Sequence, residues 1–137
     1  MLVQVCLPHG QRAQIQFRNT ATGEMWFIIR NTSHYSVDYV NEVSLILPKS
    51  VVKTIIENID RFNNGNEFPA RRYKFPDVGA NAYHILFEAN QYSDRKLEIA
   101  IATESKFGGI LNEAFIQLDR DNAKLVADEL RYRLLED

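Results

Sequence analysis

Apolar and polar residues alternate along much of the chain, and this period of two predicts β-strands with one buried and one exposed face. In RAQIQFR at 12–18, Ala13, Ile15 and Phe17 fall on one side and the arginines and glutamines on the other. Similar runs predict further strands. They are LVQVCL at 2–7, EMWFIIR at 24–30, EVSLIL at 42–47, AYHILFEA at 82–89, KLEIAIAT at 96–103 and EAFIQL at 113–118.

Two other segments have the spacing of amphipathic helices. The first occupies 48–64, with Pro48 expected in its first turn and Gly65 after its last. Its apolar stripe consists of Val52, Ile55, Ile56, Ile59 and Phe62. The second follows Asp119 or Asp121, either of which can cap its N-terminus. Its apolar face consists of Ala123, Val126, Ala127, Leu130 and Leu134.

The transition from strand to helix occurs twice, as LILPKSVVKTIIENI at 45–59 and as IQLDRDNAKLVADEL at 116–130. A proline- and glycine-containing stretch at 64–81 joins the two halves, and ARRYKF within it predicts a short edge strand. We therefore expect an α+β fold of two tandem ββββα units, approximately 1–65 and 70–137. Because one helix covers only part of a four-stranded sheet, the units should pack as a pseudo-dimer of antiparallel sheets with both helices in a shared core.

The 137 residues are 45% hydrophobic, which favours a single domain over 1–137. A net charge of −2 gives no overall attraction to nucleic acid or to anionic membranes, so any such binding requires a local patch. The single cysteine excludes an internal disulfide and fits a reducing cytoplasm. No apolar run is long enough to cross a bilayer, and the N-terminal segment resembles a strand more than a signal peptide.

Catalytic motifs are absent from the sequence. There is no nucleophile elbow, phosphate-binding loop or dinucleotide fingerprint, and the paired glycines in KFGGILN are most simply a tight turn between strands. Cys6 and His9 have ligand-like spacing but lack two further partners for a zinc site. We expect neither an enzyme nor a bound metal or cofactor.

Cations and aromatic residues gather on the strands at 12–18 and 24–30. Their outward positions are Arg12, Gln14, Gln16, Arg18, Trp26 and Arg30. Arginines spaced along such a face can neutralise phosphates while an aromatic ring stacks on a base. The alternative is an ordinary solvated sheet face with the tryptophan tucked beneath a loop.

A second cluster within ARRYKF comprises Arg71, Arg72, Tyr73 and Lys74. If it lies beside the first sheet it would extend the same groove. Alternatively, the charges protect a strand edge from aggregation. The second half places Glu88, Glu98 and Gln117 where the first half carries arginines, so we expect binding mainly on the N-terminal sheet.

The repeated order of four strands and a helix resembles the Whirly and Pur-alpha type of proteins, and a fused dimer of the transcriptional positive cofactor type. The residues that carry the resemblance are the two strand-to-helix junctions with EMWFIIR and KLEIAIA. The resemblance implies binding of single-stranded nucleic acid, with DNA favoured over RNA. The ten residues of the two clusters would form the site, with Tyr35 as a further stacking residue. Exposed strand edges suggest a homodimer or larger oligomer. The alternative function is a protein-interaction or chaperone-like adaptor module.

Overall fold

The chain forms two four-stranded antiparallel sheets, each followed by one helix, in a computed structural model that describes residues 2–6, 11–32, 40–65, 68–76, 82–89, 95–105 and 107–135. The first half contains β1 (Leu2–Cys6), β2 (Arg12–Asn19), β3 (Met25–Thr32), β4 (Val40–Leu47) and α1 (Lys49–Asn63). The second half contains β5 (Arg71–Pro76), β6 (Ala82–Ala89), β7 (Leu97–Glu104), β8 (Ile110–Leu118) and α2 (Arg120–Leu135).

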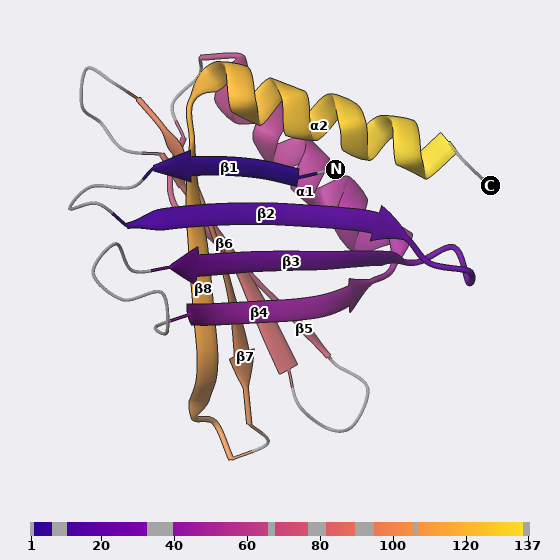
Figure 1. Ribbon diagram of the computed structural model, residues 1–137, viewed down its shortest axis with the longest axis vertical. Helices are drawn as coiled ribbons and strands as arrows, with labels where there is room; N and C mark the ends of the chain where they lie inside the picture. Colours follow the sequence, from indigo (N-terminus) through magenta and orange to yellow (C-terminus); the bar gives the residue numbers. More distant parts are fainter. Residues whose placement is uncertain are drawn as a thin grey trace.

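The two sheets, which we call sheet A (β1–β4) and sheet B (β5–β8), have the simple strand orders β1-β2-β3-β4 and β5-β6-β7-β8. In Figure 1 the strands of sheet A run across the view and those of sheet B cross behind them, with both helices at the upper right. One continuous apolar core includes residues from both sheets and both helices. The predicted α+β fold of tandem ββββα units with a shared core is therefore confirmed.

The inward rows of the strands follow the alternation in the sequence. On β2 the side chains of Ala13, Ile15 and Phe17 are fully buried, and the rings of Phe17 and Phe27 on β3 stack 6.1 Å apart. The same holds in sheet B, where Ile99 and Ile116 are fully buried opposite each other. Burying one face of each strand fixes its register, because a shift of one residue would expose the whole apolar row.

Three strands extend beyond their predicted ends. Residues 31–32 and 40–41 belong to β3 and β4, beyond the ends of the strands predicted at 24–30 and 42–47. β8 likewise begins at Ile110, directly after a tight turn in which Gly108 has a φ of 90°. Pro48 precedes the first helical residue as the N-cap of α1, instead of lying within the first turn.

The helices bury the predicted stripes against the sheets. All five apolar residues of the α1 stripe are buried, and Asn64 with the following Gly65 (φ 75°) ends that helix. Asp119, one of the two predicted caps of α2, accepts a hydrogen bond from the backbone amide of Asn122 at 2.8 Å. Asn58 departs from the predicted pattern, since its polar side chain is buried. Its amide donates to the carbonyl of Thr54 at 2.9 Å.

Asparagines at the ends of the inward rows join the two halves. Asn31 continues the inward row of β3, and its amide donates to the carbonyl of Phe115 on β8 at 2.7 Å, while the Phe115 amide donates back at 3.0 Å. Asn41 donates to the carbonyl of Glu113. At the other end of sheet A, Asn19 donates to the carbonyl of Arg133 on α2 at 2.9 Å. Side-chain amides thus satisfy backbone groups where the apolar core ends.

Candidate nucleic-acid interface on sheet A

Strand pairing brings the first predicted cluster together on the outer face of sheet A. In the antiparallel register Arg18 lies opposite Trp26, Gln16 opposite Ile28, and Gln14 opposite Arg30. Outward residues on one strand recur every ~6.8 Å, twice the rise per residue. The six residues Arg12, Gln14, Gln16, Arg18, Trp26 and Arg30 therefore occupy one surface, which we call the arginine face.

Trp26 is held in place from two sides. The guanidinium carbon of Arg18 lies 4.4 Å from the centre of the Trp26 ring, a cation–π contact. The indole Nε1–H donates a hydrogen bond to the Ser44 hydroxyl on β4 at 2.9 Å. The tryptophan is thus partly buried on the outer face of sheet A, and its neighbours fix the orientation of its ring.

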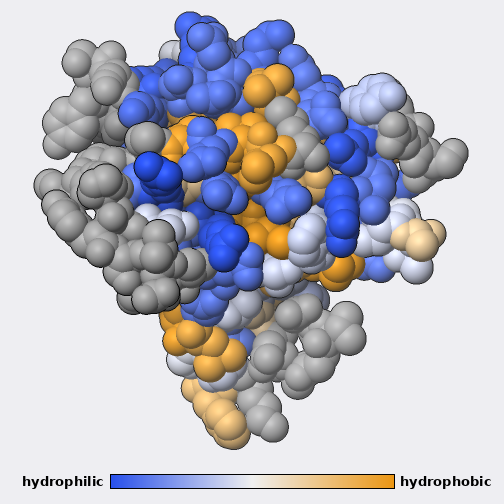
Figure 2. All heavy atoms as spheres, in the orientation of Figure 1, coloured by the Kyte–Doolittle hydropathy of each residue, from blue (hydrophilic) through white to orange (hydrophobic). Residues whose placement is uncertain are grey.

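Apolar residues interrupt the polar surface of the arginine face. Ile46 on β4 lies opposite Trp26 and is 48% exposed, whereas Ile28 at the centre is buried. Figure 2 shows this mixture on the side of the molecule that faces the viewer, where hydrophobic and hydrophilic side chains adjoin. Ser44 and Ile46 were not predicted as site residues, although the alternation in EVSLIL already places them outward.

The arginines of this face are available for a ligand. Among the described residues, Arg12, Arg18 and Arg30 all have exposed side chains and form no ion pair. Glu42, which lies beside Arg30 in the register, is the one carboxylate among the described strand residues on this face. The face therefore carries more positive than negative charge, despite the net negative charge of the whole chain. Tyr35 lies outside the described residues.

The second predicted cluster does not extend the arginine face. It forms β5, which pairs with β6 as the edge strand of sheet B, so the predicted edge strand is present but belongs to the other sheet. Tyr73 points inward, where its ring packs against Phe87 and its hydroxyl contacts the Asn58 amide at 3.2 Å. Arg71 shares that inner face, while Arg72 and Lys74 point outward.

The outer face of sheet B carries carboxylates on β6 and β7, as expected from the sequence. Glu88, Glu98 and Gln117 are direct neighbours across three strands. Further along, Glu104 contacts His84 Nε2 and lies 3.3 Å from Lys74 Nζ. Hydrogen bonding from His84 is the main cause that holds the pKa of Glu104 below its ordinary value, and Lys74 adds to it.

The lowered pKa of Glu104 makes stability depend on pH. A carboxyl whose pKa is lowered by folding contributes stability above its unfolded pKa, and that contribution is lost as the pH falls through the folded pKa. Glu104→Gln should therefore be less stable than the wild type at pH 7, and the difference should shrink below about pH 4. Urea denaturation of both proteins between pH 3 and pH 7 measures it. A difference that stays constant over this range contradicts the assignment.

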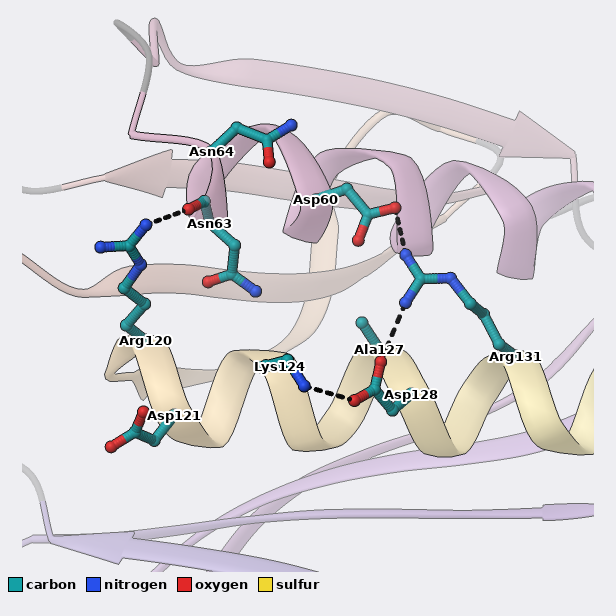
Figure 3. A pocket seen from close by; sticks show the side chains of 9 residues that line it. All are labelled: Asp60, Asn63, Asn64, Arg120, Asp121, Lys124, Ala127, Asp128 and Arg131. Atoms are coloured by element: carbon teal, nitrogen blue, oxygen red, sulfur yellow. Dashed lines mark hydrogen bonds and ion pairs between the residues drawn. The ribbon is translucent and has the colours of Figure 1, made fainter.

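A groove of about 370 Å³ between α1 and α2 holds charges of both signs (Figure 3). Arg131 bridges Asp60 on α1 and Asp128 on its own helix, and Lys124 pairs with Asp128 at 3.2 Å. Hydrogen bonding to Asp60 is the main cause that raises the pKa of Arg131. Arg120 donates to the carbonyl of Asn63 at the end of α1. These charged groups pair with one another or with backbone carbonyls, and the contacts of Arg131 and Arg120 hold α2 against α1.

Within the described ranges, no group of three or more histidine, cysteine or acidic residues is placed to hold a metal ion. Neither helix in the described part of the chain has the length and apolar character needed to cross a membrane.

Solved structures of known proteins share this architecture. The sequence matches no family model and no curated protein. The structure superposes on WHY3 from Arabidopsis thaliana with a TM-score of 0.60 and 8% identity, covering 98% of this chain and 86% of that one. WHY1 from the same plant gives 0.60 and 7%, covering 98% and 82%. The plant transcriptional regulator PBF-2 gives 0.59 and 9%, covering 99% and 90%. These are Whirly proteins, so the predicted resemblance to the Whirly fold is confirmed.

Proposed function

We propose that this protein binds single-stranded nucleic acid, DNA in preference to RNA, on the arginine face of sheet A. The observation that carries the proposal is the pair formed by Arg18 and Trp26, flanked by Arg12 and Arg30 on one exposed surface. The similarity to the Whirly proteins, one of which is described as a plant transcriptional regulator, supports it. The preference for DNA rests on that similarity, because phosphates and base faces are common to both nucleic acids.

Binding on this face would be electrostatic and largely independent of sequence. The three arginines would contact phosphates as the strand crosses β2 and β3, and each contact releases a counterion. A base would stack on the Trp26 ring or on the planar guanidinium of Arg18, since both present flat surfaces. Gln14 and Gln16 would donate hydrogen bonds to the backbone. No step requires a cofactor or a covalent reaction.

Of the second cluster, only Arg72 and Lys74 point outward, and they do so on the other sheet. Lys74 is already paired with Glu104. We therefore leave Arg71, Arg72, Tyr73 and Lys74 out of the proposed interface and assign binding to the arginine face alone.

The tryptophan provides a local test, because Trp26 is the only tryptophan of the chain. Titration with a single-stranded DNA oligonucleotide at low salt should quench its fluorescence, and fluorescence anisotropy of a labelled oligonucleotide should give the same affinity. A duplex of the same length and an RNA strand of the same sequence serve as comparisons. Absence of binding to any of these at low salt would refute the proposal.

A second candidate function, protein interaction, is favoured by the tip of the β7–β8 hairpin. Phe107, Ile110 and Leu111 are 89%, 57% and 62% exposed, and they lie close together in sequence at the turn drawn at the bottom of Figure 1. Clustered apolar residues at a surface are typical of contact sites. We propose that this tip contacts a second copy of the chain.

We expect the wild type to associate at micromolar concentration and Ile110→Ser/Leu111→Ser to sediment as a monomer in analytical ultracentrifugation. The reason is that the two substitutions remove apolar area from the tip while leaving the buried rows of β8 intact. A matched control is Leu125→Ser, which removes an exposed leucine of α2. A monomeric wild type would show that the chain does not self-associate. A double variant that associates as well as the wild type would show that the tip is not the contact.

A further inference from the structure

A cleft of about 410 Å³ opens where the end of β4 and the first turns of α1 meet the end of β5. Phe75 and Tyr83 line its apolar wall, with their ring centres 5.3 Å apart. Its volume lies within the ~300–1,000 Å³ range of small-ligand sites. Tyr83 is buried, so this aromatic wall is the inner part of the cleft.

The cleft adjoins the arginine face through Ile46. This residue lines the cleft and is also the register neighbour of Trp26, so the two sites share a wall at the edge of sheet A. A strand that stacks on Trp26 and continues across β4 therefore reaches the opening directly. Arg18, Trp26 and Ile46 thus lead from a phosphate contact to an open, largely apolar cleft.

Polar groups in the cleft are few. Glu24, which precedes β3, contributes a carboxylate, and Ser50 and Thr54 of α1 contribute hydroxyls. One Glu24 oxygen accepts a hydrogen bond from the Thr22 hydroxyl at 3.1 Å, and the Thr54 hydroxyl donates to the Ser50 carbonyl at 3.2 Å. The second carboxylate oxygen of Glu24 is the strongest acceptor in the lining. An apolar space with one strong acceptor matches a flat aromatic ligand that carries N–H donors.

We propose that this cleft receives one nucleobase of the bound strand and prefers guanine. This inference rests on the function proposed above and adds a base-selective subsite to it. Guanine presents two adjacent N–H donors to a carboxylate, whereas thymine presents a single N–H between two carbonyl oxygens that a carboxylate repels. The aromatic side chains contact the apolar surface of the base, and Glu24 selects its edge.

The test compares oligothymidylate with the same oligonucleotide carrying a central guanine, by anisotropy at fixed salt. The wild type should bind the guanine-containing strand roughly tenfold more tightly, in line with the discrimination of one good paired contact. Ser50→Trp, which fills the cleft, and Glu24→Gln, which weakens the acceptor, should both bring this ratio close to one. Lys53→Trp, at an exposed position of α1 outside the lining, should keep it.

The outcomes separate the cleft from the arginine face. The guanine subsite is overturned if the wild type binds both strands with equal affinity, or if both cleft variants leave the ratio of the two affinities unchanged. In either case, salt-dependent binding would still support the arginine face. If no oligonucleotide binds, a titration with guanosine monophosphate, followed by NMR shifts of the Ser50 and Val51 amides, decides the cleft by itself. No shifts there overturn it. A cleft variant that changes the sedimentation coefficient but not the ratio also overturns it, because the cleft would then hold protein.

Discussion

Arg18→Ala/Arg30→Ala should lower the affinity for single-stranded DNA on the order of tenfold at low salt, because two charge-assisted phosphate contacts are lost. The slope of log K against log salt should fall by about 1.4, since each phosphate contact to a single strand contributes about 0.7. Anisotropy titrations at several salt concentrations measure both quantities. The loss of affinity should be greater at low salt than at high salt, because at high salt phosphate contacts contribute little to binding.

The matched control is Lys53→Ala/Arg61→Ala, which removes the same charge from exposed positions of α1. If the control lowers affinity and slope as much as the double variant does, net charge and not the arginine face determines binding. Removing Arg18 also uncovers the ring of Trp26, so the fluorescence of the unliganded variant should differ from that of the wild type. Trp26→Leu is a useful third variant, because it should reduce affinity without changing the salt slope.

Asn31→Ala should destabilise the fold by about 2–4 kcal/mol, the second large effect that we expect. The substitution leaves both the amide and the carbonyl of Phe115 without their partner, and an unsatisfied group costs about 1–3 kcal/mol. Two such groups together cost about 2–6 kcal/mol, and we expect the lower half of this range because the site is only partly buried. Urea denaturation measures the difference in the free energy of unfolding.

Gln16→Ala provides the control, since this residue is exposed on the neighbouring strand and its loss should change stability by no more than about 0.5 kcal/mol. Asn31→Asp tests the geometry. At neutral pH its carboxylate can accept from the Phe115 amide but repels the Phe115 carbonyl. Relative to the wild type it should regain stability below about pH 4, where a protonated carboxyl can donate. A loss of less than 0.5 kcal/mol in Asn31→Ala would show that the two hydrogen bonds are replaced by water.

The inward rows could be predicted from sequence because their cause is local. Alternation in RAQIQFR decides which residues of β2 are buried, and each short connection then sets the next strand antiparallel to the last. The same rule correctly predicted that Arg18 and Trp26 share the outer face. Their contact, and the role of Ser44 as the partner of the indole, depend on the register between strands, which alternation alone does not give.

Features that depend on contacts distant in the chain could not be predicted. Asn31 and Asn41 have the composition of a turn, yet they pair with each other at the ends of β3 and β4, and their side chains bind the backbone of β8. Tyr73 belongs to a sequence rich in cations, yet the pairing of β5 with β6 turns it toward α1. The cleft beside Ile46 joins segments from both halves, so no single stretch of sequence contains it.

The asparagine contacts on β8 also limit the addition of further strands to sheet B. Chains that associate by strand addition need an outer strand with unoccupied backbone groups. On β8 the groups at Glu113 and Phe115 are already occupied by Asn41 and Asn31 of the same molecule. Sheet B is then open to strand addition on its β5 side only, so it cannot grow at both sides into a continuous intermolecular sheet. Without these asparagines, the free backbone groups of β8 would be a template for strand addition. We therefore expect a variant that lacks them to aggregate before it unfolds completely.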